Sequence, residues 1–235
     1  MQNNVLYAAN SRGKIEAAIV HALAQSLLTL SKLAQDVLLF TTSEYGFFTV
    51  SDSLVTGSSI MPQKKNISMM ELVRAKASIM LGYQAQIMGV LAGLPSGYNK
   101  DYQETKRPFM DALYLALKSF AVVERTVSSL TPNEDRLLAA CTPELYATDR
   151  AYELVRRARP SATLIGRWAR PWPTCRLWTR AGLRSRTHTG SSGNLGLDRL
   201  TEVVARHNST TTGKLGALAE HWRTLLPGPT DADRP

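Results

Sequence analysis

Cysteine is scarce in this sequence, since Cys141 and Cys175 are the two present among 235 residues. Two thiols this far apart make no disulfide framework and have no metal-ligand spacing. The four histidines, at positions 21, 188, 207 and 221, lack such spacing as well. We therefore expect neither a metal nor a cofactor.

A secretory signal is also missing. The N-terminus reads Met1-Gln2-Asn3-Asn4, without the basic start and apolar stretch that such a signal needs. We find no apolar run that we expect to span a bilayer. With 44% hydrophobic and 20% charged residues, the composition is that of an ordinary soluble protein. We predict a cytoplasmic protein that has no membrane partner and is long enough to bury a core.

Acidic residues are absent between Glu153 and Asp198, and lysine is absent there too. Residues 159–186 hold seven arginines, and the net charge falls from +9 to +2 when these seven are left out. A strongly basic protein often binds nucleic acid or acidic membranes. Here the basicity belongs to one segment, so we expect no nucleic-acid partner for the rest of the chain.

What the chain does contain is three long apolar patterns with steps of three and four residues, which is the spacing of one helix face. They run over 15–37, 69–90 and 109–130. Each predicts a rod of about 30–40 Å at ~1.5 Å per residue. Such long stripes exceed what a three-helix unit needs to bury, so partners should cover the surplus. We predict an all-α protein, with a further helix from about residue 200. The members of the three patterns are Ile15, Ile19, Leu23, Leu27, Leu30, Ala34 and Val37; Met69, Leu72, Val73, Ile79, Tyr83, Ile87 and Val90; and Phe109, Leu113, Leu117, Phe120, Val123, Val127 and Leu130.

The segment between the first two patterns holds the most informative motif. Residues 56–66 read Thr-Gly-Ser-Ser-Ile-Met-Pro-Gln-Lys-Lys-Asn, and we call them the signature loop. Glycine and serine allow a mobile loop, and Pro62 fixes one backbone angle. Two hydroxyls, two ammonium groups and an amide could meet an anionic substrate. Composition alone favours a surface turn followed by a solvated basic patch.

The ordered string resembles the signature loop of the fumarase/aspartase superfamily, and its Gln-Lys-Lys-Asn ending is similar to the argininosuccinate lyase family. A second block, 93–106, resembles the segment of that family that holds the arginine end of the substrate. Blocks 140–149 and 186–198 are similar to it more weakly. The resemblance runs from about residue 2 to residue 157 and resumes near Arg186. It implies an all-α, long-helix bundle of this superfamily, incomplete in this chain.

The resemblance also implies roles for individual residues. Ser58 corresponds to the base that removes a proton beside a carboxylate, and Lys64 to the cation near the negative charge that develops. Asn66 corresponds to an amide that binds the substrate. A free serine hydroxyl is too weak a base at neutral pH, so its surroundings must stabilise the alkoxide. Helix N-termini and backbone donors are plausible sources of this stabilisation.

Within the second block, Tyr98, Gln103 and Lys106 match positions of the family that bind the substrate. Gln103 and Lys106 are three residues apart and are expected to share a helix face. A tyrosine hydroxyl and a glutamine carbonyl can accept hydrogen bonds from a guanidinium, whereas Lys106 is better suited to a carboxylate. An ordinary polar helix start remains the alternative for all three.

The resemblance implies a lyase that cleaves argininosuccinate to arginine and fumarate by β-elimination, a step of arginine biosynthesis. Its partners would be a small-molecule substrate and further copies of the chain in a homotetramer, whose active sites combine segments of three subunits. Two alternatives remain: another fumarate-releasing lyase, such as one that cleaves adenylosuccinate, and a non-catalytic oligomerising or structural protein on the same scaffold.

We expect this chain to be a C-terminal fragment that is inactive alone. In the family, a Thr-His-like and a Ser-Arg-Asn-like segment also build each site, and both precede the point where this chain begins. We predict a central bundle over 1–131 with the signature loop at 56–66, and the start of a C-terminal helical domain over 132–158. An irregular segment over 159–185, the rest of the helical domain over 186–226 and a disordered tail over 227–235 would follow.

The segment 159–185 departs from the rest of the chain. It holds three of the four tryptophans along with Pro160, Pro171 and Pro173, and neither a helix nor a strand pattern is clear. Its borders coincide with the loss of the family resemblance. We hypothesise a shifted reading frame, because G+C-rich codons read out of register give arginine, proline, tryptophan and cysteine. The rival is an Arg/Trp segment that stacks on bases and contacts phosphates.

Resequencing the gene across codons 155–190 tests this hypothesis. A compensating pair of insertions or deletions is expected, which would restore the family-like sequence when corrected. An intact frame at high coverage would eliminate the hypothesis. In that case the rival predicts binding to any duplex that weakens steeply as salt is raised.

Overall fold

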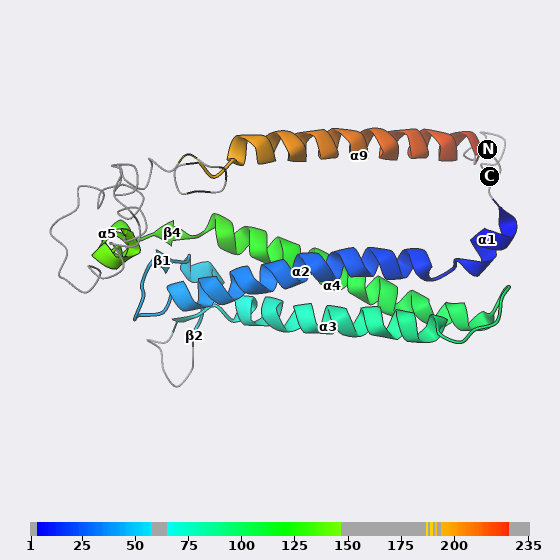
Figure 1. The fold of residues 1–235 in the computed structure, drawn as a ribbon, viewed down its shortest axis with the longest axis horizontal. Coiled ribbons are helices and arrows are strands. Elements are labelled where there is room, and N and C mark those ends of the chain that lie inside the picture. The colour runs from blue at the N-terminus through cyan, green and yellow to red at the C-terminus, as the bar shows by residue number, and fades with distance from the viewer. Residues whose placement is uncertain are drawn as a thin grey trace, which may run out of the picture. The chain divides into compact units, whose positions relative to one another are not determined.

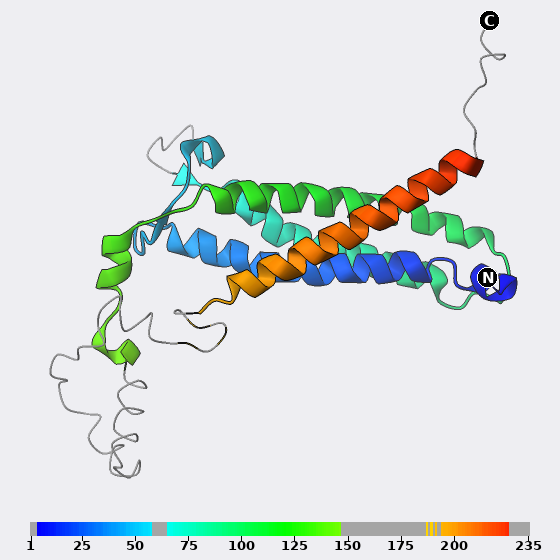
Figure 2. The ribbon, with the colours of Figure 1, turned by 90° about the horizontal axis from the view of Figure 1, so that it is seen from above.

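The computed structural model describes residues 4–57, 65–146, 187, 189, 191 and 194–225. The chain forms two compact units, Met1–Ala140 and Cys141–Pro235. In the first, helices α2 (Lys14–Phe40), α3 (Ser68–Leu91) and α4 (Lys106–Ser128) pack along their lengths into a bundle (Figures 1 and 2). The short helices α1 (Val5–Asn10) and α5 (Glu134–Ala139) belong to the same unit. In the second unit, α9 (Leu197–Leu225) is a single long helix preceded by the 3-10 turn η3 (Pro143–Tyr146).

The strands are two residues long and form two antiparallel pairs. β1 (Phe48–Thr49) pairs with β4 (Thr131–Pro132), so it joins the chain after α2 to the chain after α4. β2 (Thr56–Gly57) pairs with β3 (Lys65–Asn66) directly before α3. Two 3-10 helices complete the unit, η1 (Asp52–Leu54) and η2 (Lys100–Thr105). The all-α prediction is confirmed.

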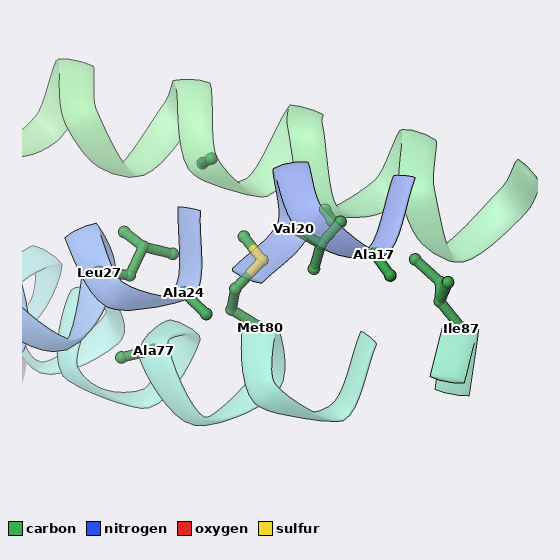
Figure 3. Packing of buried hydrophobic residues seen from close by; sticks show 9 residues of the cluster. Ala17, Val20, Ala24, Leu27, Ala77, Met80 and Ile87 are labelled. Carbon is green, nitrogen blue, oxygen red and sulfur yellow. The ribbon is translucent and has the colours of Figure 1, made fainter. Parts of the chain in front are cut away.

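The bundle core is built around small side chains. Alanines at positions 17, 24, 77, 112 and 116 are at most 7% exposed and come from all three long helices. They surround larger residues such as Leu27, Met80 and Ile87, which are fully buried (Figure 3). Short side chains let helices approach closely, and each contact then gains dispersion energy. A second cluster, which includes Met70 and Val73, continues the core toward β3.

The sequence pattern located the helices correctly and their buried faces in part, since the stripe members Leu27, Val73 and Ile87 are buried. Ile15 is 67% exposed and Leu117 is 67% exposed, although both belong to the predicted stripes. In their place Val20 and Ala116 are buried. The predicted stripes are therefore partly the outer faces of the bundle. Alanines share the seam between the helices with larger residues such as Leu27 and Met80, and other large apolar residues lie outside it.

Helix ends follow local hydrogen bonding. α2 stops at Phe40, and the Thr41 hydroxyl donates to the Val37 carbonyl at 2.7 Å, as expected for a hydroxyl residue that competes for backbone groups. Serine is a residue type that often caps helices, but Ser68 is the first residue of α3, and Ile67 occupies the N-cap position without a side-chain bond. The Ser68 hydroxyl instead lies 2.6 Å from the Thr56 hydroxyl. The Ser68 hydroxyl therefore contacts β2 and does not accept a hydrogen bond from the backbone amides at the start of α3.

Two buried hydroxyls on α4 are satisfied within their own helix. Ser119 is 0% exposed and donates to the Leu115 carbonyl at 2.7 Å. Thr126 is 1% exposed and donates to the Val122 carbonyl at 2.9 Å. A buried polar group without a partner would cost stability, and these bonds remove that cost without help from α2 or α3.

α2 is long and apolar enough to cross a membrane by length and composition, which differs from the expectation drawn from the sequence. In this structure its buried residues lie in the bundle core. It also contains charged residues along its length, among them Glu16, Lys32 and Asp36. We interpret α2 as the core helix of the bundle.

Replacing Met80 with alanine is expected to lower the free energy of unfolding by about 2–5 kcal/mol, because it leaves a cavity at a fully buried site. Met80→Leu keeps most of the volume, and its expected loss is below about 1.5 kcal/mol. Urea unfolding followed by helical circular dichroism measures both. Equal losses in the two variants would contradict the assignment of Met80 to a close-packed core.

Candidate functional site

The base of the signature loop is held closed by its flanking strands. Thr56 lies opposite Asn66, and Gly57 lies opposite Lys65. The Thr56 hydroxyl donates to the Asn66 carbonyl at 3.2 Å and also contacts the Ser68 hydroxyl. Thr56 thus ties the incoming strand both to the outgoing strand and to the first residue of α3. The two ends of the loop are fixed side by side.

The loop base lies at one end of the bundle (Figure 1). The chain reaches it from α2 through a group of aromatic rings, in which Phe40 packs against Tyr45, Phe47 and Phe48 with ring centroids 5.6–6.5 Å apart. The Asn133 amide donates to the Phe47 carbonyl at 2.8 Å, next to the β1–β4 pair. These contacts fix where the chain leaves α2 and enters η1 and β2.

Of the residues predicted at this end, Asn66 is described and is half-buried in β3. Ser58 and Lys64 lie outside the described residues. Asn66 lies two residues before the N-terminus of the 24-residue helix α3. The unpaired amides of a helix start favour negative charge, so the described surroundings of the loop suit an anionic group.

The other predicted residues gather at the opposite end of α3. Gln103 belongs to η2, and Lys106 is the first residue of α4. Residues three apart eclipse one another in a 3-10 helix, which brings these two to one side. The pKa of Tyr98 is lowered from its ordinary value, first by a hydrogen bond with Arg12, then by one with Gln103 and by the charge of Arg12, and least by the charge of Lys106. Tyr98, Gln103 and Lys106 are thus brought together.

Arg12 was not among the predicted residues. Its guanidinium carbon lies 5.0 Å from the centre of the Tyr98 ring and 5.5 Å from that of Tyr102. Arg12 is distant from both in the sequence and lies in the short link between α1 and α2. Its type and position carry no signal that would reveal the contact, since only the folded chain brings the link to this turn.

The two groups of predicted residues are not brought together within one chain. α3 has 24 residues and separates Asn66 from Tyr98. At about 1.5 Å per residue the helix is roughly 36 Å long. Asn66 and the Tyr98 group therefore lie at opposite ends of the bundle, which is much too far apart for one small substrate.

A polar surface pocket lies at the loop end of the bundle, between η1 and the last turns of α4, with a volume of about 370 Å³. No sequence motif indicates this pocket, because its serines come from two distant segments. Its lining residues are Ser51, Ser53, Leu54, Glu124, Arg125, Ser128 and Ser129.

Comparisons with known proteins agree with this architecture. Residues 2–82 match the model of a family described as lyase. The argininosuccinate lyase of Sorangium cellulosum is 40% identical over 205 residues, which are 87% of this chain and 47% of the relative. The argininosuccinate lyase of Schizosaccharomyces pombe is 43% identical over 134 residues, 57% of this chain and 29% of the relative.

Solved lyase structures share the fold. An EDDS lyase in complex with formate is 30% identical with a TM-score of 0.56, and the match covers 62% of this chain and 29% of that one. A class II fumarase from Schistosoma mansoni, 17% identical with a TM-score of 0.55, has the same fold over 62% of this chain and 31% of its own. The chain spans about half the length of its Sorangium lyase relative. The segment 159–185, to which the reading-frame hypothesis applies, lies outside the described residues.

The signature loop offers a direct test of how its base is closed. Thr56→Val removes the hydroxyl that contacts both Asn66 and Ser68. A hydrogen bond contributes roughly 0.5–1.5 kcal/mol, so we expect tryptic cleavage at Lys64 and Lys65 to be about two- to tenfold faster. Mass spectrometry of the timed digest measures this. Thr49→Val, at an exposed threonine of β1, is the matched control and should leave the rate unchanged. Equal rates in both variants would show that Thr56 does not hold the loop base.

Proposed function

We propose that this chain forms part of a lyase that cleaves argininosuccinate to arginine and fumarate by β-elimination. The observation that carries the proposal is the signature loop, whose ordered string ends in the paired strands β2 and β3 at the start of α3. Two relatives at 40% and 43% identity are argininosuccinate lyases, which supports this substrate over the adenylosuccinate alternative.

The chemistry assigns a role to each end of the bundle. At the loop end, Ser58 would remove the proton beside the carboxylate, and Lys64 would neutralise the charge that develops on the aci-carboxylate. Asn66 would hold the substrate there. At the other end, Tyr98 and Gln103 would accept hydrogen bonds from the arginine end of a substrate, and Lys106 would pair with a carboxylate.

The distance between the ends requires more than one copy of the chain. Asn66 and Tyr98 are separated by the full length of α3, roughly 36 Å at 1.5 Å per residue. No single copy places both groups on one argininosuccinate molecule. Copies that pack with opposite directions bring the loop end of one beside the Tyr98 end of another. We infer a homo-oligomer, a tetramer as in the family resemblance, with shared sites.

The outer faces of the bundle support this inference. On α4, Met110 is 61% exposed, Tyr114 is 65% exposed and Leu117 is 67% exposed, at helical steps of four and three. On α3, Leu72 is 50% exposed and Ile79 is 48% exposed. Apolar stripes of this kind mark protein contacts. We propose that further copies of the chain cover them, and that the assembly works in the cytoplasm.

The proposal is tested by a reconstitution experiment. The chain is produced alone and together with the N-terminal part of the Sorangium relative, and fumarate release from argininosuccinate is followed by absorbance. We expect no turnover from the chain alone, measurable turnover from the mixture, and a multimeric mass by light scattering. A mixture that assembles as a multimer but releases no fumarate would refute the proposed reaction, and a monodisperse monomer would refute the shared site.

Adjacent serines provide a matched pair for the catalytic assignment. In the reconstituted sample, Ser58→Ala is expected to lower kcat by about a hundredfold to ten-thousandfold, which is the usual effect of a general base. Ser59→Ala removes a hydroxyl one residue away and should have a far smaller effect. Equal losses from the two variants would contradict the role of Ser58.

A further inference from the structure

The end of α1 and the link that follows it contact the turn that carries Tyr98 in two ways. The Asn10 side-chain oxygen accepts a hydrogen bond from the Gly97 amide at 2.6 Å. The Arg12 guanidinium faces the rings of Tyr98 and Tyr102. Segments more than 80 positions apart in the sequence thus meet at the residue proposed to hold the arginine end of the substrate.

The position of Arg12 is set by the residue after it. Gly13 is buried and has φ = +80°, a left-handed conformation that side chains with a Cβ rarely adopt. A Cβ at this position would lie 2.4 Å from Leu91 Cδ2, at the end of α3. The link therefore runs against the last turn of α3, immediately before the segment that contains Tyr98. Arg12 is half-buried there.

The two rings that face Arg12 differ in how firmly they are held. Tyr102 is 6% exposed and belongs to η2, whereas Tyr98 is 69% exposed. A guanidinium over an aromatic face is attracted by the ring quadrupole. Arg12 thus contacts both the exposed ring of Tyr98 and the buried ring of Tyr102. Gln103 of η2 also contributes to the lowered pKa of Tyr98, after Arg12.

We propose that Arg12 is a positioning residue that holds the Tyr98 ring and hydroxyl in the orientation needed at the arginine end of the substrate. The role of Tyr98 in this statement rests on the proposed function. The contact between Arg12 and Tyr98 does not, and it is measurable without any turnover. The hydrogen bond and charge of Arg12 are also the first and third causes of the lowered pKa of Tyr98, with Gln103 second and Lys106 smallest.

The test follows the ionisation of Tyr98 in the full chain. Tetranitromethane nitrates the phenolate form of tyrosine, and peptide mass spectrometry reports the rate at each tyrosine across a range of pH. Tyr7 is 68% exposed, close to the 69% of Tyr98, and serves as a reference for reagent access in the same sample. Because Arg12 favours the phenolate, Arg12→Met is expected to move the midpoint of Tyr98 nitration to higher pH and to slow its nitration severalfold near neutral pH.

Two variants accompany Arg12→Met. Lys14→Met removes an exposed cation two residues away and should leave the midpoint of Tyr98 unchanged. Arg12→Lys keeps a charge but loses the planar fork, so it should shift the midpoint by a smaller amount in the same direction. If Arg12→Met loses its helical circular dichroism, Arg12→Lys decides the question. A midpoint equal to that of the unchanged chain in the folded variant overturns the proposal.

A kinetic measurement separates this inference from the proposed function. In the reconstituted lyase, Arg12→Met is expected to raise KM for argininosuccinate on the order of tenfold with a smaller change in kcat, because binding is lost and the proton-removing end is untouched. If the unchanged reconstituted protein shows no activity, the proposed function fails while the nitration result still stands. A shifted nitration midpoint with an unchanged KM would restrict Arg12 to the ring contact and overturn its role at the substrate.

Discussion

Close packing of small side chains along the seam of α2, α3 and α4 is the constraint on which the rest of the structure depends. Alanines from all three helices fill the seam, together with a few larger residues such as Leu27 and Met80. Because the seam is narrow, it buries little of the apolar surface that the helices carry. Large side chains such as Leu117 remain on the outside. The unit is consequently a rigid rod with apolar flanks, and it is suited to associate along its length.

Rigidity explains why the two groups of candidate residues are separated. The signature loop enters α3, and the Tyr98 turn leaves it, so the helix acts as a spacer between two functional ends. A flexible connection could fold back and join them, but a continuous 24-residue helix cannot. Because α3 separates the two groups, one chain cannot form a complete site. The same separation favours the packing of two chains in opposite directions, which places the loop end of one beside the Tyr98 end of the other. Stability and site assembly depend on the same surfaces.

Much of this arrangement is predictable from the sequence. Apolar periodicity predicts α2, α3 and α4, and the motif resemblance predicts that they form a long-helix bundle. Periodicity identifies the buried faces only in part, because Ile15 and Leu117 are exposed although they are as apolar as the buried Leu27 and Ile87. What decides burial is where the neighbouring helices approach closely, and the alanines of the seam lie at those places. Helix propensity and hydrophobicity scales do not contain that distinction.

The candidate site also contains one part that the sequence predicts and one part that it does not. Gln103 and Lys106 are close in sequence, so local spacing brings them together. Arg12 is linked to Tyr98 only through the path of the α1–α2 link over the end of α3, which depends on the backbone of Gly13. The hydroxyl of Ser68 illustrates the limit of local rules. Its sequence position suggests a helix cap, but a nearby threonine offers a competing partner across the β2–β3 pair.

The buried hydroxyls of Ser119 and Thr126 have a consequence for how this rod can vary. Each donates to a carbonyl one turn back that is also the acceptor of the ordinary helix bond. Exchanging either for alanine or valine orphans no donor or acceptor on a neighbouring helix. At these two positions α4 therefore presents no hydrogen-bonding group that a helix packed against it would have to match.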